Sequence, residues 1–231
     1  VPGTPYSGEV VLQDYIRAHD FLTSVSVIEG EVGPQGMYPY LTKRLEPIAR
    51  RIFADPKVEP ATHTFSHPFF WEPEKASQRE GFTAEYGMNM AIPNYPTMNL
   101  EREIVGSRDY IQRELLPAGK QVRLIFWSGE ALPSAEAIGM AYAAGMANVN
   151  GAETFITRAN PSLTGLYPLL RPTSGGLQIY APIINENLYT NLWTGPFYGF
   201  ERVLDTFELT DSPRRLRGLN LYYHFYSGTK Q

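Results

Sequence analysis

The chain has 231 residues and a formal net charge of −4, with 43% hydrophobic and 19% charged residues, which is typical of a globular protein with one substantial core. The slightly negative charge offers no broad basic surface, so nucleic acid and anionic lipid are not expected partners. Cysteine is absent, which excludes disulfides, thiolate metal ligands and cysteine nucleophiles. No segment approaches the roughly 18 consecutive apolar residues that a membrane-spanning helix needs.

Strands and helices are predicted to alternate along the chain, within a single domain over residues 1–231. In chain order, the sequence predicts a helix over 7–19, a strand over 23–28, a helix over 38–54, a strand over 58–62, a helix over 99–116, a strand over 122–126, a helix over 134–144, strands over 146–149 and 177–180, a helix over 197–206 and a strand over 218–223. Asn99 is the expected N-cap of its helix, and Pro47 predicts a kink or a break. The alternation favours an α/β fold with a parallel sheet or barrel.

Polar side chains follow several of the predicted strands. His63, Glu130, Asn150 and His224 each stand at or just after a strand end. In parallel α/β folds, functional side chains gather at the C-terminal ends of strands. Residues 69–97 form a long aromatic segment without regular structure, and so long a connection in a compact domain is usually functional.

His63 and His67 are the sharpest chemical feature. Two histidines four positions apart, directly after a strand, can reach one metal ion. The alternative is a pair of hydrogen-bonded loop histidines. A zincin metalloprotease is excluded, because Thr64 stands where its glutamate base would be and Pro68 is incompatible with one helix through both histidines.

The segment from His63 to His67 reads His-Thr-Phe-Ser-His and resembles the His-Ser/Thr-x-x-His motif of the metal-dependent, NodB-like polysaccharide deacetylases. Further segments resemble the subgroup of that family that modifies the Pel exopolysaccharide of biofilms. They are Ser26–Val32, Ala61–Pro68, Ala181–Tyr198 and Tyr222–Gly228. The resemblance implies a distorted (β/α)7 barrel and removal of acetyl groups from an N-acetylated amino-sugar polymer.

The resemblance also implies roles for individual residues. His63 and His67 would bind a divalent metal, expected to be zinc, with cobalt or nickel as alternatives. His224 stands at the position of the family's Leu-x-His histidine, which protonates the leaving amine. The alternative is that His224 is a hydrogen-bonded histidine at a strand end. Trp193 resembles the tryptophan of the family's Asp-Trp element, which lines the substrate cleft, but no aspartate precedes it, so an acid that orients the catalytic histidine must come from elsewhere.

Other expected substrate contacts rest on weaker signals. Glu130 stands near the place of the family's Arg-x-x-x-Tyr motif, which this chain lacks. Sugar hydroxyls are expected to meet Asn150 and Asn187, and Asn185 and Glu186 are further candidates, although all four are also common turn residues. Aromatic side chains over 69–71, at Tyr95 and at Trp193 are expected to stack on sugar faces. His19 is expected to be structural.

The family's first motif, with one metal-binding and one base aspartate, is not found. Glu29 and Glu31 follow a strand, but that strand corresponds to the family's second. The aspartates are therefore expected upstream of Val1, in a chain that lacks the first strand of its barrel. Counting agrees with this expectation, because six strands are predicted where the family fold has about seven.

These inferences predict a periplasmic or secreted deacetylase that acts on an amino-sugar polysaccharide, alongside partner proteins of an exopolysaccharide export system. The alternative is a carbohydrate-binding or scaffold module on the same fold, in which the altered motifs reflect lost chemistry. The missing aspartates favour the module, whereas His63, His67 and His224 favour the enzyme.

Overall fold

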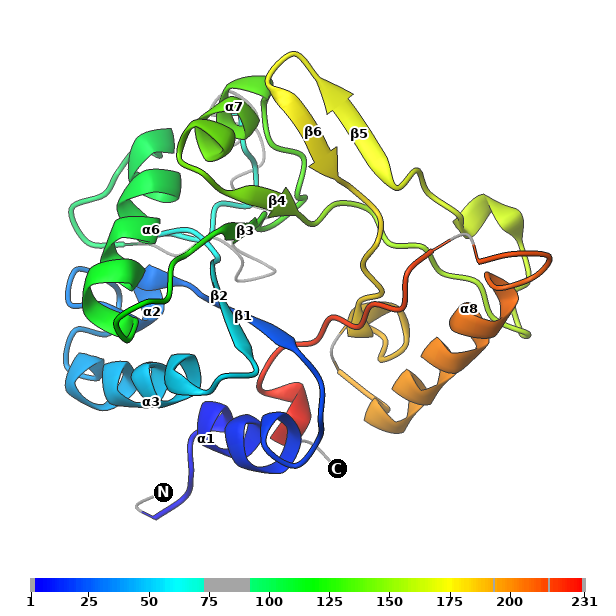
Figure 1. Ribbon diagram of the computed structural model, residues 1–231, viewed down its shortest axis with the longest axis horizontal. Helices are drawn as coiled ribbons and strands as arrows, with labels where there is room; N and C mark the ends of the chain where they lie inside the picture. The colour runs from blue at the N-terminus through cyan, green and yellow to red at the C-terminus, as the bar shows by residue number, and fades with distance from the viewer. Residues whose placement is uncertain (1–2, 73–91, 193, 216, 230–231) are drawn as a thin grey trace. The chain divides into compact units, whose positions relative to one another are not determined.

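Parallel strands are the framework of the fold. The computed structural model describes residues 3–72, 92–192, 194–215 and 217–229. It contains a six-stranded sheet of order β1-β2-β3-β4-β6-β5, in which β1 to β4 pair in parallel (Figure 1). The strands are β1 Thr23–Val27, β2 Val58–Thr62, β3 Leu124–Phe126, β4 Ala147–Val149, β5 Leu170–Thr173 and β6 Gly176–Ile179. The predicted α/β class is thereby confirmed, and the first five strand predictions each match a strand.

The chain divides into two compact units, which are described separately. The sheet unit comprises Leu12–Val149 and Pro172–Gln178, and the terminal unit comprises Val1–Val11, Asn150–Arg171 and Ile179–Gln231. The prediction of a single domain stays a prediction.

In the sheet unit, helices pack on the strands and bury their apolar faces. Helix α3 (Thr42–Ala54) and helix α6 (Ser107–Tyr110) contact β2, and α7 (Ala135–Ala143) contacts β4. Ile104, Ile125 and Ile138 are fully buried between these layers. The remaining helical segments of the unit are η1 (Leu12–Ile16), α2 (Glu29–Val32), η2 (Arg102–Gly106) and η3 (Ile111–Leu115).

The helix predicted over 99–116 is one continuous helical stretch with wide, π-type turns at both ends, namely η2, α6 and η3. Asn99 caps it as expected, because its Oδ1 accepts a hydrogen bond from the backbone N–H of Arg102 at 2.8 Å. Pro47 does not break α3. It lies on the exposed side of that helix, where water can satisfy the carbonyl that proline leaves without a helical donor.

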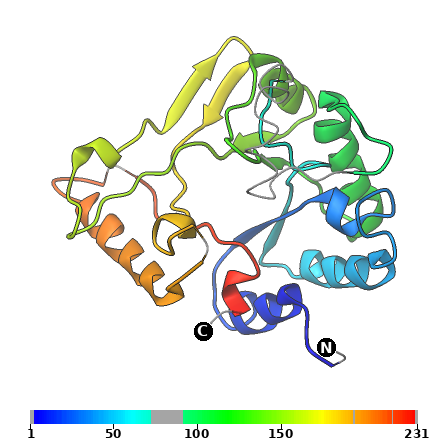
Figure 2. The ribbon, with the colours of Figure 1, turned by 180° about the vertical axis from the view of Figure 1, so that it is seen from behind.

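The terminal unit consists mainly of short helical turns around a small aromatic core. Its elements are α1 (Ser7–Val11), η4 (Leu163–Gly165), η5 (Glu186–Leu188), η6 (Phe197–Arg202), α8 (Val203–Leu209) and η7 (Ser227–Thr229). Ile184, Tyr189 and Val203 form the centre of the core, against which three phenylalanines pack, namely Phe155, Phe200 and Phe207. Near the two ends of the chain, α1 contacts η7 (Figure 2).

Two sequence predictions in the later part of the chain are wrong. Residues 218–223 do not form a strand, and only Tyr222 pairs there, in an isolated parallel bridge with Asn185. Leu219 and Leu221 are exposed, so a longer strand here would not be stabilised by burial of its apolar side chains. Strand β5 was not predicted from the sequence. It lies at the edge of the sheet, where Pro172, which has no N–H, is tolerated.

None of the helices in the described part of the chain is long and apolar enough to cross a bilayer.

Candidate functional site

His63 directly follows β2, and its side chain has a defined hydrogen-bond partner. The backbone N–H of His63 donates to the Val27 carbonyl at 2.9 Å, which continues the β1–β2 pairing. Its ring atom Nδ1 lies 2.8 Å from the carbonyl oxygen of Phe126. A carbonyl only accepts hydrogen bonds, so Nδ1 carries the proton. In the neutral ring Nε2 is then the lone-pair nitrogen, which is the arrangement of a metal-ligating histidine held by a carbonyl behind it.

The loop after His63 is held by one buried carboxylate. Glu103 is fully buried and accepts hydrogen bonds from the Phe65 N–H at 2.9 Å, the Ser66 N–H at 2.8 Å and the Ser66 hydroxyl at 2.5 Å. Two loop residues, Thr64 (φ 72°) and His67 (φ 54°), adopt left-handed backbone conformations that side chains other than glycine disfavour. The anchoring by Glu103 maintains this turn.

The turn brings the two imidazole rings together. The ring centroids of His63 and His67 are 4.8 Å apart, with an angle of 70° between the ring planes. Two imidazoles that share a tetrahedral metal at the usual nitrogen distance have centroids about 5 Å apart. The pair therefore fits two positions of a metal shell. Among the described residues, no group of three His, Cys, Asp or Glu side chains is placed to hold an ion.

Glu29 and Glu31 do not supply further ligands. Glu29 is buried and forms a bidentate ion pair with Arg102, at 2.5 and 2.7 Å. The same guanidinium lies 3.6 Å from the centre of the Phe65 ring. Glu31 is exposed on α2. Glu29 and Arg102 are thus a second support for the histidine loop rather than a catalytic acid and its partner.

Glu130 lies in the loop after β3, which is joined to the segment that follows His67. Its backbone N–H donates to the Phe69 carbonyl at 2.9 Å, and the Ser128 hydroxyl donates to the Pro68 carbonyl at 2.7 Å. Gly129 has φ 62°, and a side chain there would collide with the Phe69 backbone. The structure therefore brings the loops of His63, His67 and Glu130 together within the sheet unit.

The aromatic residues expected to stack on sugars are largely structural. Phe70 and Trp71 are completely buried, and the Trp71 ring packs edge-on against Trp127 with centroids 4.7 Å apart. Tyr95 uses its hydroxyl to accept from the Asn99 N–H at 2.7 Å, so it supports a helix start. The greater part of the 69–97 segment, and Trp193, lie outside the described residues.

In the terminal unit, His224 is held by a buried carboxylate. Glu186 Oε1 lies 2.7 Å from His224 Nδ1 and accepts from the His224 backbone N–H at 2.9 Å. The His224 ring also contacts Tyr222 edge-on, with centroids 5.3 Å apart, and stacks on Tyr226 at 5.2 Å. Glu186 was expected to be a sugar ligand or a turn residue; the structure makes it the acid that orients His224, the role for which the sequence offered no aspartate.

The asparagines of this unit are mainly turn residues. Asn185 Oδ1 accepts from the Asn187 backbone N–H at 3.2 Å and so opens the η5 turn. Asn150 has φ 96°, a conformation that asparagine tolerates well, and its side chain hydrogen-bonds to the Tyr222 hydroxyl. The interpretation of Asn150 and Asn187 as sugar ligands stays a prediction.

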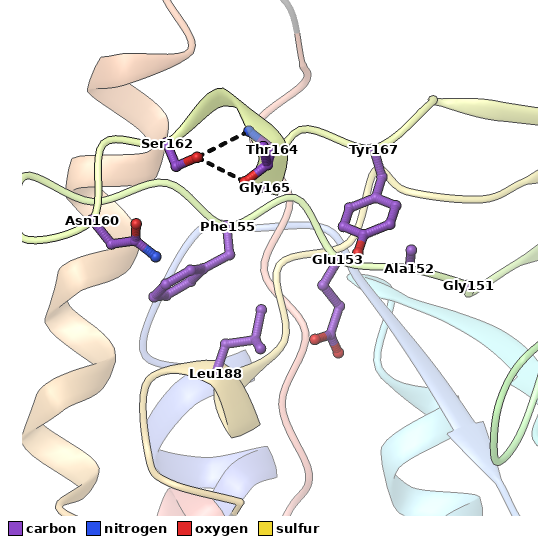
Figure 3. A pocket seen from close by; sticks show the side chains of 10 residues that line it. All are labelled: Gly151, Ala152, Glu153, Phe155, Asn160, Ser162, Thr164, Gly165, Tyr167 and Leu188. Atoms are coloured by element: carbon purple, nitrogen blue, oxygen red, sulfur yellow. Dashed lines mark hydrogen bonds between the residues drawn. The ribbon is translucent and has the colours of Figure 1, made fainter.

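A cavity of about 400 Å³ in the terminal unit was not foreseen from the sequence (Figure 3). Its lining residues are Gly151, Ala152, Glu153, Phe155, Asn160, Ser162, Thr164, Gly165, Tyr167 and Leu188. Burial raises the pKa of the Glu153 carboxyl from its ordinary 4.5 to about 7, although a hydrogen bond from the Asn185 amide favours the charged form. Glu153 and its hydrogen-bond partner Asn185 are 32 residues apart in the sequence, so no local sequence motif predicts their contact.

A scan with protein-family models, a search of curated proteins and a search of solved structures found no match to this chain.

Glu103→Ala is expected to destabilise the protein by about 2–5 kcal/mol, because it leaves two buried backbone N–H groups and a buried hydroxyl without their acceptor. Chemical denaturation measures the change. Glu101→Ala, at an exposed position next to the same helix, is the matched control and should stay within about 0.5 kcal/mol of the wild type. Equal stabilities for both variants would show that Glu103 does not hold the loop.

Glu153→Gln is expected to stabilise the protein at pH 8 but not at pH 5. Because the folded-state pKa of Glu153 is raised, the folded protein binds this proton more tightly than the unfolded chain, and stability is lost as pH rises from about 4.5 through 7. Glutamine cannot ionise and avoids that loss, which is at most about 3 kcal/mol for a shift of this size and corresponds to about 6–12 °C in Tm. Thermal unfolding at both pH values tests this, with the exposed Glu201→Gln as control; a pH-independent difference would contradict it.

Proposed function

We propose that the chain is the domain of a metal-dependent N-deacetylase that acts on an amino-sugar polysaccharide, of the Pel exopolysaccharide type. The observation that carries the proposal is the paired histidine arrangement, in which the Phe126 carbonyl fixes the proton on His63 Nδ1 and the two rings stand 4.8 Å apart. The resemblance of the His63–His67 segment to the deacetylase motif agrees with this chemistry. The proposal includes the fold, a distorted (β/α)7 barrel, and a periplasmic or secreted location with partners in polymer export.

Several roles in the proposed reaction would fall to named groups of this chain. His63 and His67 would hold a divalent cation, zinc by preference, with cobalt or nickel as alternatives. The bound cation would polarise the acetamide carbonyl and lower the pKa of the attacking water. The third ligand and the general base are not assigned to residues of this chain.

His224 would protonate the departing amine. Its Nδ1 faces the Glu186 carboxylate at 2.7 Å, so the proton available for transfer is the one on Nε2. The carboxylate fixes the ring orientation and stabilises the imidazolium that must form before the proton is given up. Glu186 thus supports a general acid without contacting substrate itself.

The second candidate is a carbohydrate-binding or scaffold module without catalytic activity. One specific observation favours it: the described residues contain no third ligand next to the histidine pair. Both candidates bind amino-sugar polymer, so a binding assay does not separate them, whereas acetate release does.

Zinc binding tests the histidine pair independently of activity. We expect the chain to take up zinc in a reaction that His63→Ala and His67→Ala each abolish, because two ligands are the minimum for a defined site. His19→Ala is the matched control, since His19 is exposed and lies outside the motif. Titration calorimetry and metal analysis after gel filtration measure the stoichiometry. Uptake that is unchanged in the double variant would rule out the pair as the metal site.

Acetate release tests the activity. The substrates are N-acetylated glucosamine and galactosamine oligosaccharides, and the enzyme is this chain extended upstream and loaded with zinc or cobalt. Loss of a general acid typically costs 10²–10⁴-fold in rate, so His224→Ala should lose at least about 100-fold and Glu186→Gln less than that. If the loaded, extended protein releases no acetate, the enzyme proposal fails and the module remains.

A further inference from the structure

The cavity of the terminal unit is open to solvent and is lined by two chain segments and one helical turn. Residues 151–155 form one wall and residues 160–167 the other, and the Phe155 N–H joins them by donating to the Gly165 carbonyl at 2.9 Å. A side chain at Gly165 would collide with the Phe155 carbonyl, so glycine permits the walls to meet. Leu188, the last residue of η5, closes the floor (Figure 3). The volume of about 400 Å³ lies in the range of small-ligand sites.

The cavity combines one carboxylate with hydroxyl, amide and aromatic groups. This set suits a ligand that carries both a positive charge and hydroxyl groups. Of the described residues that line it, Glu153 alone has a charged side chain. The rings of Phe155 and Tyr167 provide aromatic surface, on which a sugar or an ammonium group can pack. The Ser162 and Thr164 hydroxyls lie 2.7 Å apart at the opposite wall, and Asn160 adds an amide.

Few groups of the described residues interact with the Glu153 carboxylate. The Asn185 amide hydrogen-bonds to it, and the phenols of Tyr189 and Tyr222 are the titratable groups near enough to sense its charge. Arg217 is the charged group at the rim, where it donates to the Tyr167 backbone carbonyl. A half-buried carboxylate with a single amide donor gains from a ligand that brings a positive charge.

The turn η5 links the cavity to the histidine–glutamate pair. Asn185 precedes the turn and bonds Glu153, Glu186 within it holds His224, and Leu188 at its end lines the cavity. Two further acceptors of this turn, Glu186 Oε2 and Asn187 Oδ1, are buried and accept no hydrogen bond from the residues that the structure describes.

We propose that the Glu153 cavity binds a de-N-acetylated amino-sugar unit, with the ammonium group of the sugar against the Glu153 carboxylate and its ring against the aromatic side chains. The inference rests on the proposed function in that it takes an amino-sugar polymer as the ligand. It adds a selectivity: the protein binds polymer that already carries free amines more tightly than fully acetylated polymer.

Binding of matched oligosaccharides to the 231-residue chain tests the proposal. The probes are tetrasaccharides of glucosamine and of galactosamine, each as the free amine and fully N-acetylated, titrated calorimetrically at pH 7.5. We expect at least one free-amine probe to bind at least about 10-fold more tightly than its acetylated form, the factor that one charge-assisted hydrogen bond provides. Glu153→Gln should remove this preference, and the exposed Glu201→Gln, which removes the same charge elsewhere in the unit, should retain it.

The pH dependence provides a second readout. Because the pKa of Glu153 is about 7, the carboxyl loses its charge between pH 7.5 and 5.5, whereas protonation of the sugar amine is common to wild type and variant. The ratio of wild-type to Glu153→Gln affinity for the amine should therefore fall about 10-fold or more between pH 7.5 and 5.5. Equal binding of amine and acetylated probes, no binding of either, or a Glu153→Gln variant that keeps the preference would overturn the inference. Acetate release is measured separately, so failure of the deacetylase proposal and failure of the cavity proposal give different results.

Discussion

The buried carboxylate of Glu103 is the interaction on which the geometry of the histidine loop depends. A charge that is fully removed from water is costly unless it is satisfied by donors, and Glu103 receives three from Phe65 and Ser66. Those donors belong to a loop with left-handed residues on both sides, at Thr64 and His67. The hydrogen bonds to Glu103 thus stabilise the left-handed backbone of the loop, and the loop in turn satisfies the buried carboxylate.

The sequence predicted the sheet better than its surroundings. Strands such as 23–28 are short, β-branched and bounded by turn residues, so their propensity and their burial agree. In residues 218–223, leucines alternate with glycine, asparagine and tyrosine, a pattern that also predicts a strand. Leu219 and Leu221 are exposed, however, and an alternating segment whose apolar side chains are not buried against a sheet does not form a strand ladder. Propensity is local, whereas the presence of a neighbouring strand is decided by the rest of the chain.

The candidate site likewise contains residues that local sequence predicts and residues that only tertiary contacts reveal. His63 and His67 were predictable because their spacing and their strand are within one short segment. The support of His224 was not, because Glu186 lies 38 residues away and its role depends on the pairing of Tyr222 with Asn185. Likewise, aromatic content alone could not distinguish a sugar platform from a core, and Phe70 and Trp71 belong to the core. Sequence spacing identifies candidate ligands, but tertiary contacts decide which side chains support them.

Pro172 has a consequence for the behaviour of the protein in solution. It lies exposed on β5, the strand at one end of the sheet. An open sheet edge offers hydrogen-bonding groups to any extended chain that approaches, and this is a common route to aggregation. Because proline has no N–H, it interrupts that row of donors in the middle of the four-residue strand. We therefore expect the β5 edge to resist strand addition from a second molecule.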